Sequence, residues 1–147
     1  MELRELQDRM EIRELTDVFA NLADVKDVEG QGELFLKDGV LEFQMGADGE
    51  VNEIAGRDAI VEAFRNTVGP AKLVYHINGQ QTLISYSGEE AEGVAYCEAT
   101  LSNDNVTVTT NYVRYSDHYV KMDGKWYLKK RRTTFIYAES RPVQTQA

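Results

Sequence analysis

A histidine near the start of a predicted strand is the residue best suited to do chemistry. His76 lies in the segment LVYHIN (73–78), and the two-residue period of a strand puts it on one face with Val74 and Asn78. The apolar neighbour on that face favours an inward orientation. An imidazole in a cleft changes its protonation near neutral pH, which suits a general base. The alternative is a core histidine bonded to a backbone carbonyl, and spacing alone favours it.

An aspartate at the end of the first predicted helix could work with this histidine. The carboxylate of Asp24 could hold an imidazole in one tautomer and stabilise its charged form. The alternative is a turn or capping residue that competes with Asp27 for the start of the next helix. Taken alone, Asp24 fits this structural interpretation better.

A tyrosine in a later strand could complete the set. Tyr115 shares a strand face with Val113, so a buried phenol there could donate a hydrogen bond to a substrate oxygen. Tyrosine is also a common strand residue, and simple packing in the core is an equal alternative.

Cofactor and metal sites are not expected. The chain has one cysteine and two histidines, too few for a zinc-ligand set, and the phosphate-binding and dinucleotide-binding glycine motifs are missing. No histidine or other base lies near Cys97 in the sequence, so we predict a small buried hydrophobe rather than a nucleophile. His118 differs in parity from Tyr115 and is expected on the opposite sheet face.

Charge argues against nucleic-acid and membrane partners. The chain carries 16 basic and 25 acidic residues, a net charge of −9, which an anionic surface would repel. One basic run, 129–132 (KKRR), is divided between two faces if it is a strand. We therefore predict that its side chains are solvated edge charges or partners for carboxylates.

Length and composition predict one globular domain. The 147 residues are 42% hydrophobic and 28% charged, so residues 1–147 are expected to form a single unit, with 138–147 as a flexible tail. No apolar run approaches the length of about 18 residues that suggests a membrane span, and the first residues are charged. A cytoplasmic location is therefore expected.

The elements that position the candidate residues follow from periodicity. Ile12, Leu15, Phe19 and Leu22 form one apolar face of a helix over 3–23. Further helices are predicted over 28–36 and from Gly56 to 68, and strands over 40–45, 72–86, 91–102, 106–121 and 125–137, with a type I′ hairpin at 122–125. Helices followed by strands predict an α+β fold, in which a curled antiparallel sheet wraps one helix and leaves a cavity.

These motifs together resemble SnoaL-like proteins of the nuclear transport factor 2-like superfamily, over about residues 8–137. The resemblance implies an α+β cone, with three N-terminal helices packed in a strongly bent, mainly antiparallel sheet. It is carried by Ile12-x-x-Leu15, Ala23-Asp24-x-x-Asp27 and Leu34-Phe35-x-x-Asp38-Gly39, then by Gly56-Arg57 and His76-Ile77-Asn78, and finally by Arg114-Tyr115-x-Asp117-x-x-Val120-Lys121-x-Asp123-Gly124-x-Trp126.

Within the superfamily, the chain is most similar to the branch of scytalone dehydratase and bile acid 7-alpha-dehydratase. That similarity implies catalytic roles for Asp24 and His76, while Phe19, Ala23 or Phe43 stand where those enzymes have tyrosines. Leu101, Val113, Tyr115 and Phe135 replace further polar groups of those enzymes. The catalytic dyad is thus kept, whereas the polar substrate-holding groups are lost, which implies an apolar ligand. The expected pocket is lined by Phe19, Ala23, Phe43, Phe64, Cys97, Leu101, Val113 and Phe135.

The leading functional hypothesis is a cofactor-independent lyase or isomerase acting on a small hydrophobic carbonyl compound. His76 would remove a proton beside the carbonyl, Asp24 would stabilise the imidazolium, and Tyr115 would donate to the enolate oxygen. The alternatives are a non-catalytic protein that binds a small molecule, and an interaction module that uses the open sheet face.

A homodimer or higher homo-oligomer is also expected. The strands carry more apolar and aromatic residues than one sheet face can hold, so the outer face must bury Tyr112, Tyr119 or Tyr127 against another surface.

Overall fold

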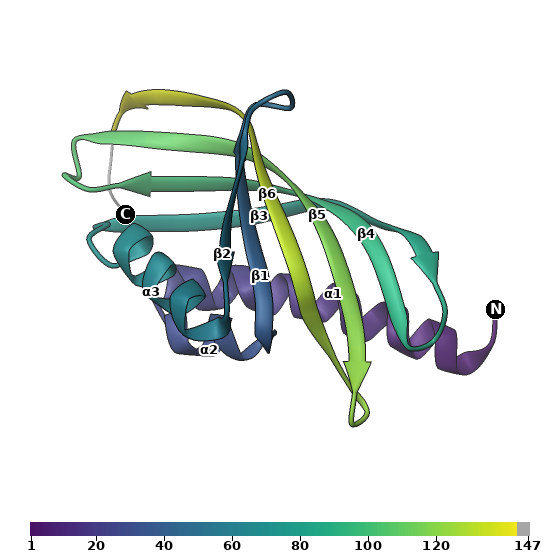
Figure 1. The fold of residues 1–147 in the computed structure, drawn as a ribbon. Helices are drawn as coiled ribbons and strands as arrows, with labels where there is room; N and C mark the ends of the chain where they lie inside the picture. The colour runs from purple at the N-terminus through teal and green to yellow at the C-terminus, as the bar shows by residue number, and fades with distance from the viewer. Residues whose placement is uncertain (144–147) are drawn as a thin grey trace.

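The structure is a computed structural model and describes residues 1–143, which form three helices and one curved sheet of six strands (Figure 1). Within this part of the chain, the sheet does not close, and its only parallel pair is β1 with β6. The elements are α1 (Leu3–Asp24), α2 (Val28–Glu33), β1 (Phe35–Met45), β2 (Val51–Ala55), α3 (Arg57–Val68), β3 (Leu73–Tyr86), β4 (Glu90–Ser102), β5 (Thr107–Met122) and β6 (Lys125–Pro142), and the strand order is β2-β1-β6-β5-β4-β3. The predicted α+β cone is confirmed.

At the junction between α1 and α2, Asp27 rather than Asp24 caps the second helix. Asp27 caps α2, because its side chain accepts a hydrogen bond of 2.9 Å from the backbone N–H of Gly30. Lys26 lies between the two helices with a φ of 60°, the left-handed conformation that turns the chain. Asp24 is the last residue of α1, and its carboxylate remains free to contact the sheet.

The second helix, the first two strands and the last strand differ from the sequence-based prediction. The second helix ends at Glu33, because Phe35 begins β1 and pairs in parallel with Leu128 of β6. The prediction missed β2, a five-residue strand antiparallel to β1. The expected tail is also partly wrong, since residues 138–142 pair with 107–111 of β5 and extend β6 to Pro142. Residues 144–147 of that expected tail lie outside the described residues.

The four long strands begin within one residue of their predicted starts. The β5–β6 hairpin has positive φ at both central residues, 52° at Asp123 and 79° at Gly124, as the predicted type I′ turn requires. This tight turn fixes the register of the two strands that carry Tyr115 and the basic run.

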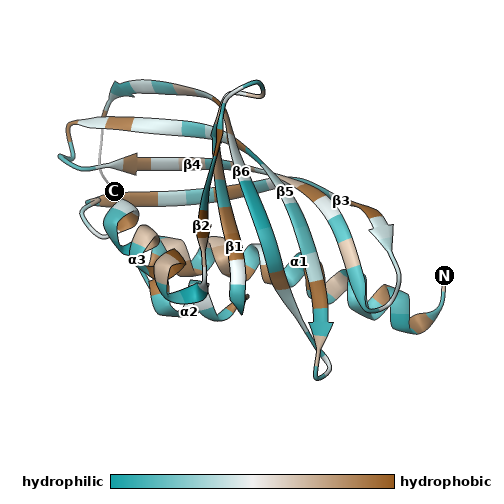
Figure 2. Cartoon of the chain, in the orientation of Figure 1, coloured by the Kyte–Doolittle hydropathy of each residue, from teal (hydrophilic) through white to brown (hydrophobic). Residues whose placement is uncertain are grey.

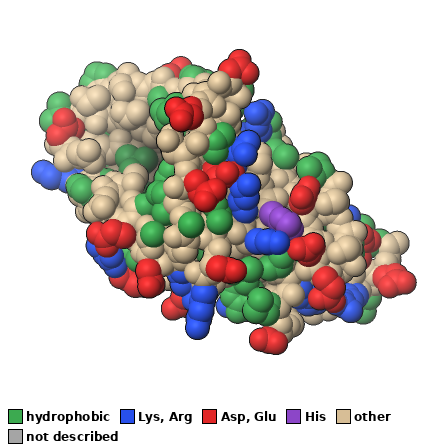
Figure 3. Space-filling view, viewed as in Figure 1, with side chains coloured by type: hydrophobic (Ala, Val, Ile, Leu, Met, Phe, Trp, Pro, Cys, Tyr) green, Lys and Arg blue, Asp and Glu red, His purple; other side chains and the backbone are tan. Residues whose placement is uncertain are grey.

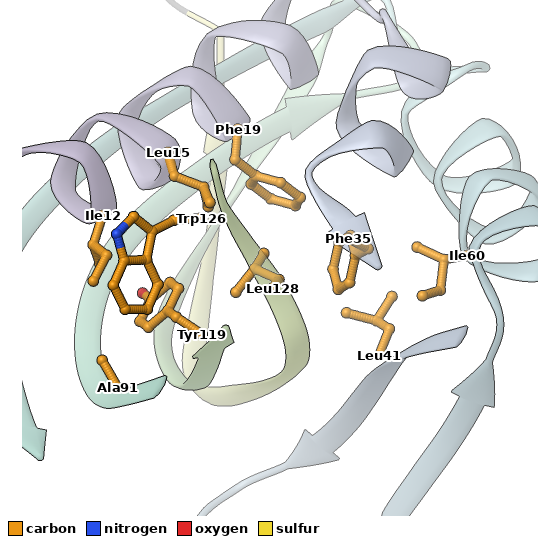
Figure 4. Packing of buried hydrophobic residues seen from close by; sticks show 10 residues of the cluster. All are labelled: Ile12, Leu15, Phe19, Phe35, Leu41, Ile60, Ala91, Tyr119, Trp126 and Leu128. Atoms are coloured by element: carbon orange, nitrogen blue, oxygen red, sulfur yellow. The ribbon is translucent and has the colours of Figure 1, made fainter. Parts of the chain in front are cut away.

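The inner face of the sheet packs on α1. Figure 4 shows Ile12, Leu15 and Phe19 of α1 pointing toward Tyr119, Trp126 and Leu128 of the sheet. Trp126 and Leu128 are buried, whereas Lys129 is exposed, as the strand period predicts. Tyr119, which the sequence places on the outer face, is fully buried in this core, so it is not available for an interface.

Hydropathy alternates along most elements rather than forming long apolar blocks (Figure 2). Within residues 1–143, no helix is long and apolar enough to cross a membrane.

Candidate active site

Two hydrogen bonds join Asp24 to His76, one to its side chain and one to its backbone. Oδ1 of Asp24 lies 2.8 Å from Nδ1 of His76, and Oδ2 accepts a 3.2 Å bond from the backbone N–H of His76. Because a carboxylate only accepts, Nδ1 carries the proton in this pair, and Nε2 is left as the basic nitrogen. Only 9% of the His76 side chain is exposed. The distance lies in the range expected for a dyad that acts as a unit.

Hydrogen bonds between α1 and β3 keep Asp24 and His76 next to each other. Two residues along β3, Nδ2 of Asn78 donates to the carbonyl oxygen of Thr16 at 3.2 Å and to the carboxylate of Asp17 at 2.9 Å. These bonds fix the strand against the helix whose last residue is Asp24. The backbone bond from His76 to Asp24 orients the carboxylate at the same point.

His76 lines a cavity of about 120 Å³. An apolar cavity of about 150 Å³ can hold a benzene ring, so this space suits a ligand of about one ring. A hollow that contains hydrophobic side chains is visible between α3 and the ends of the strands (Figure 3). The lining residues are Phe19, Ala23, Gln31, Phe43, Phe64, Thr67, Val68, His76, Ala99, Leu101, Asn111, Val113, Tyr115, Thr133 and Phe135.

Strand register explains why these residues meet. His76 pairs with Ala99 of β4, which pairs with Asn111 of β5, so all three project to the inner face. The neighbouring row contains Val113 and Phe135. Rings from α1, α3, β1 and β6 complete the wall as two aromatic pairs, Phe19 with Phe64 at 5.5 Å and Phe43 with Phe135 at 6.5 Å between centroids.

Tyr115 lies against a buried ion pair beside the cavity. The guanidinium of Arg131 lies 3.8 Å from the centroid of the Tyr115 ring and 4.5 Å from that of Phe19. Nε and Nη2 of Arg131 donate to Asp117 at 2.8 and 2.9 Å, and the Tyr119 hydroxyl donates to Asp117 at 2.7 Å. Burial raises the pKa of Tyr115, so its phenol is neutral at physiological pH, and its hydroxyl is hydrogen-bonded to the Cys97 thiol.

Cys97 does not line the cavity, which corrects its predicted place in the pocket. It is 3% exposed and packs with Ala95, Val113 and Tyr115 behind the lining. Burial raises the pKa of its thiol to about 11, so the thiolate is scarce near neutral pH. This agrees with the prediction of a small buried hydrophobe.

Every cation of the basic run 129–132 faces a carboxylate. Lys130 and Arg132 contact Glu42 at 3.3 and 3.1 Å, Arg131 binds Asp117, and Lys129 lies 3.9 Å from Glu90. The prediction of carboxylate partners is confirmed. The prediction of edge charges is wrong, because β6 lies between β1 and β5.

The second histidine is separate from the cavity. Nε2 of His118 lies 3.3 Å from Oε1 of Glu90, and His118 does not line the cavity that Tyr115 lines. Across residues 1–143, no three histidine, cysteine, aspartate or glutamate side chains gather closely enough to hold a metal ion.

Sequence reasoning missed the polar lining residues Gln31, Asn111 and Thr133, together with Thr67, Val68 and Ala99. Alternation along β5 could have found Asn111, because it shares a face with Val113. Gln31 lies between Gly30 and Gly32 in a six-residue helix, where no periodicity marks an inward residue.

Solved structures with the same fold have low sequence identity to this chain. A candidate scytalone dehydratase from Novosphingobium aromaticivorans DSM 12444 is 20% identical, with all of each chain covered and a TM-score of 0.82. The hexachlorocyclohexane dehydrochlorinase LinA-type3 from Novosphingobium barchaimii LL02 is 18% identical, with 99% of this chain and 97% of that chain covered and a TM-score of 0.77. A protein of unknown function from Mycobacterium tuberculosis is 25% identical, with 88% and 72% covered and a TM-score of 0.74.

No curated protein sequence matches the chain. The SnoaL-like domain model, in contrast, matches residues 4–132, which include α1, the dyad, Tyr115 and Arg131. Together with the nuclear transport factor 2-like fold, this match shows that the chain belongs to the SnoaL-like domain family.

Proposed function

We propose that the protein is a cofactor-independent lyase or isomerase that acts on a small hydrophobic carbonyl compound. One observation carries the proposal: a histidine whose Nδ1 is held by Asp24 lines a ring-sized, mainly apolar cavity, with Nε2 available as a base. A positioned base contributes about 10²- to 10⁴-fold to the rate of proton abstraction.

The reaction begins when Nε2 of His76 removes a proton from the carbon beside the carbonyl. The electrons of that C–H bond move onto the carbonyl oxygen and form an enolate. The phenol of Tyr115 donates to this oxygen, and a donor of this kind is worth about 10²- to 10³-fold. Asp24 stabilises the imidazolium while the enolate exists.

The second step decides the reaction class. If the β-carbon carries a hydroxyl, the enolate collapses, the C–O bond breaks, and the imidazolium returns its proton to the leaving oxygen as water. If a proton is instead added at another carbon, the product is an isomer. Neighbours named as a dehydratase and a dehydrochlorinase support the elimination.

A direct test is turnover of a ring-sized β-hydroxy ketone, such as 3-hydroxycyclohexanone, followed by the absorbance of the enone. The wild-type protein should form the enone or an isomer detectable by NMR. His76→Ala is the matched control and should lose most of this activity while its circular dichroism is unchanged. Equal rates for the two proteins would rule out His76 as the base.

A non-catalytic binding protein is the second candidate, favoured by the apolar lining. Ligand affinity would then be measurable without turnover. An interaction module would have to use the sheet face that α1 leaves open, because Ile12, Leu15 and Phe19 cover the inner face.

A further inference from the structure

One cavity residue has a polar atom without a role in the proposed reaction. Gln31 of α2 is 2% exposed and lines the same cavity as His76. Its Nε2 donates a 3.3 Å hydrogen bond to the carbonyl oxygen of Phe19 in α1. Its Oε1 is buried and has no hydrogen-bond partner among residues 1–143.

The orientation of this amide is fixed by its partner. The carbonyl oxygen of Phe19 can only accept, so the NH₂ end of Gln31 must face it, and the oxygen must be the free end. A buried acceptor with no donor is costly, and such groups in native proteins often mark a place that a ligand or a water completes.

We propose that Oε1 of Gln31 accepts a hydrogen bond from a hydroxyl or N–H group of the ligand. Within walls that are mainly apolar, the cavity then pairs the unsatisfied acceptor of Gln31 with the neutral Tyr115 phenol, beside the further polar groups of His76, Asn111 and Thr133. This pairing selects a ring-sized compound that has a hydrogen-bond donor as well as a carbonyl oxygen. The carbonyl part rests on the proposed function, whereas the donor part does not.

The preference is measurable with two unreactive probes of equal heavy-atom count. Phenol carries a donor and toluene does not, so the ratio of their dissociation constants reports the acceptor in the cavity. Calorimetric titration of the wild-type protein gives this ratio, and Gln31→Leu removes the acceptor at similar volume. We expect the ratio to shift about tenfold toward toluene in Gln31→Leu, mainly through weaker phenol binding.

Two further variants keep the test decisive. Gln80→Leu changes an exposed glutamine of β3 and should leave the ratio unchanged. If Gln31→Leu fails to fold, Gln31→Met removes the same acceptor with a more adaptable side chain. The inference is overturned if the ratio is the same in the wild type and the Gln31 variant, which would mean a purely structural amide or one satisfied by water. It is also overturned if phenol does not bind at millimolar concentration.

The result of the binding test can be distinguished from a failure of the proposed reaction. His76→Ala should abolish turnover, while Gln31→Leu should still shift the ratio in the His76→Ala background, because the Gln31 acceptor remains there when Nε2 of His76 is gone. A lost reaction with an intact preference would leave a donor-selective binding protein. An intact reaction with no preference would overturn only the assignment to Gln31.

Discussion

Asp24 and His76 are 52 positions apart in sequence, yet Oδ1 of one lies 2.8 Å from Nδ1 of the other. The contact exists because α1 ends where β3 begins to cross it, and because Asp27 rather than Asp24 caps the next helix. A turn residue would not need both carboxylate oxygens directed at one strand residue. The arrangement leaves Nε2 as the ring nitrogen that does not bond Asp24.

Tyr115→Phe should lower kcat by about 10²- to 10³-fold with little change in KM, because it removes a donor that acts mainly in the transition state. The fold should be retained, since the phenylalanine ring can keep the contact with Arg131. Steady-state kinetics and a melting curve check this, with Tyr127→Phe, outside the cavity, as the matched control. An unchanged kcat would make Tyr115 a packing residue.

Cys97 should resist alkylation in the native protein. Its thiol pKa of about 11 means that the thiolate fraction rises about tenfold for each pH unit from 7 to 10. Labelling by iodoacetamide should be slow at pH 7.5 and complete within minutes in urea, as followed by mass spectrometry. Rapid labelling of the native protein at neutral pH would contradict the buried position.

Asp8 should make stability depend on acid pH. It is 1% exposed and accepts from Tyr86 at 2.6 Å, Lys121 at 2.9 Å and Trp126 at 2.9 Å. Burial works against its ionisation, but these bonds outweigh that effect and lower the pKa of Asp8 in the folded state. The unfolded state therefore binds the proton more tightly, so the stabilisation is present above about pH 4 and is lost as pH falls through the lowered folded pKa.

Asp8→Ala should lower the free energy of unfolding by about 3 kcal/mol at pH 7, because Lys121 loses its buried partner. Urea titrations between pH 3 and 7 should show a smaller acid loss in the variant than in the wild type. Glu14→Gln changes an exposed carboxylate of the same helix and serves as the control. The same acid loss in all three proteins would disprove this role of Asp8.

We propose that a second copy of the chain covers the outer sheet face. Ile77, Tyr112 and Tyr137 line an outer groove, the rings of Tyr112 and Tyr137 stack at 4.2 Å, and the side chain of Tyr75 is 61% exposed. Sedimentation should give a dimer or larger species at micromolar concentration, and Ile77→Glu should shift it toward monomer. A wild-type protein that sediments only as a monomer would refute the proposal.

Local patterns predicted much of the fold because local physics determines those elements. The apolar stripe of α1 and the turn at 123–124 require no knowledge of distant residues. β2 was missed because its five residues gain their stability from pairing with β1 rather than from their own pattern. The helix predicted to reach 36 ends early because Phe35 is buried by a parallel partner strand.

The candidate site was predictable only in part. Taken alone, His76 and Asp24 each favoured a structural interpretation, and only the resemblance to a known family paired them. Their meeting depends on how α1 crosses the sheet, which spacing does not encode. The sequence does not distinguish Arg131 from the other cations of the basic run, because its buried contact with Asp117 depends on the register between β5 and β6. No sequence pattern marks Gln31 as an inward-facing residue, so its place in the site became clear only from the cavity that it lines.

The most direct test of the central claim is a double-mutant cycle on His76 and Asp24. The values of kcat/KM for a ring-sized β-hydroxy ketone are measured for the wild type, His76→Ala, Asp24→Asn and the double variant, with folding checked by circular dichroism. If the two residues act as one unit, each single variant should lose most of the activity and the double variant should be little worse. Single losses that multiply in the double variant, or unchanged turnover in either single variant, would contradict the account.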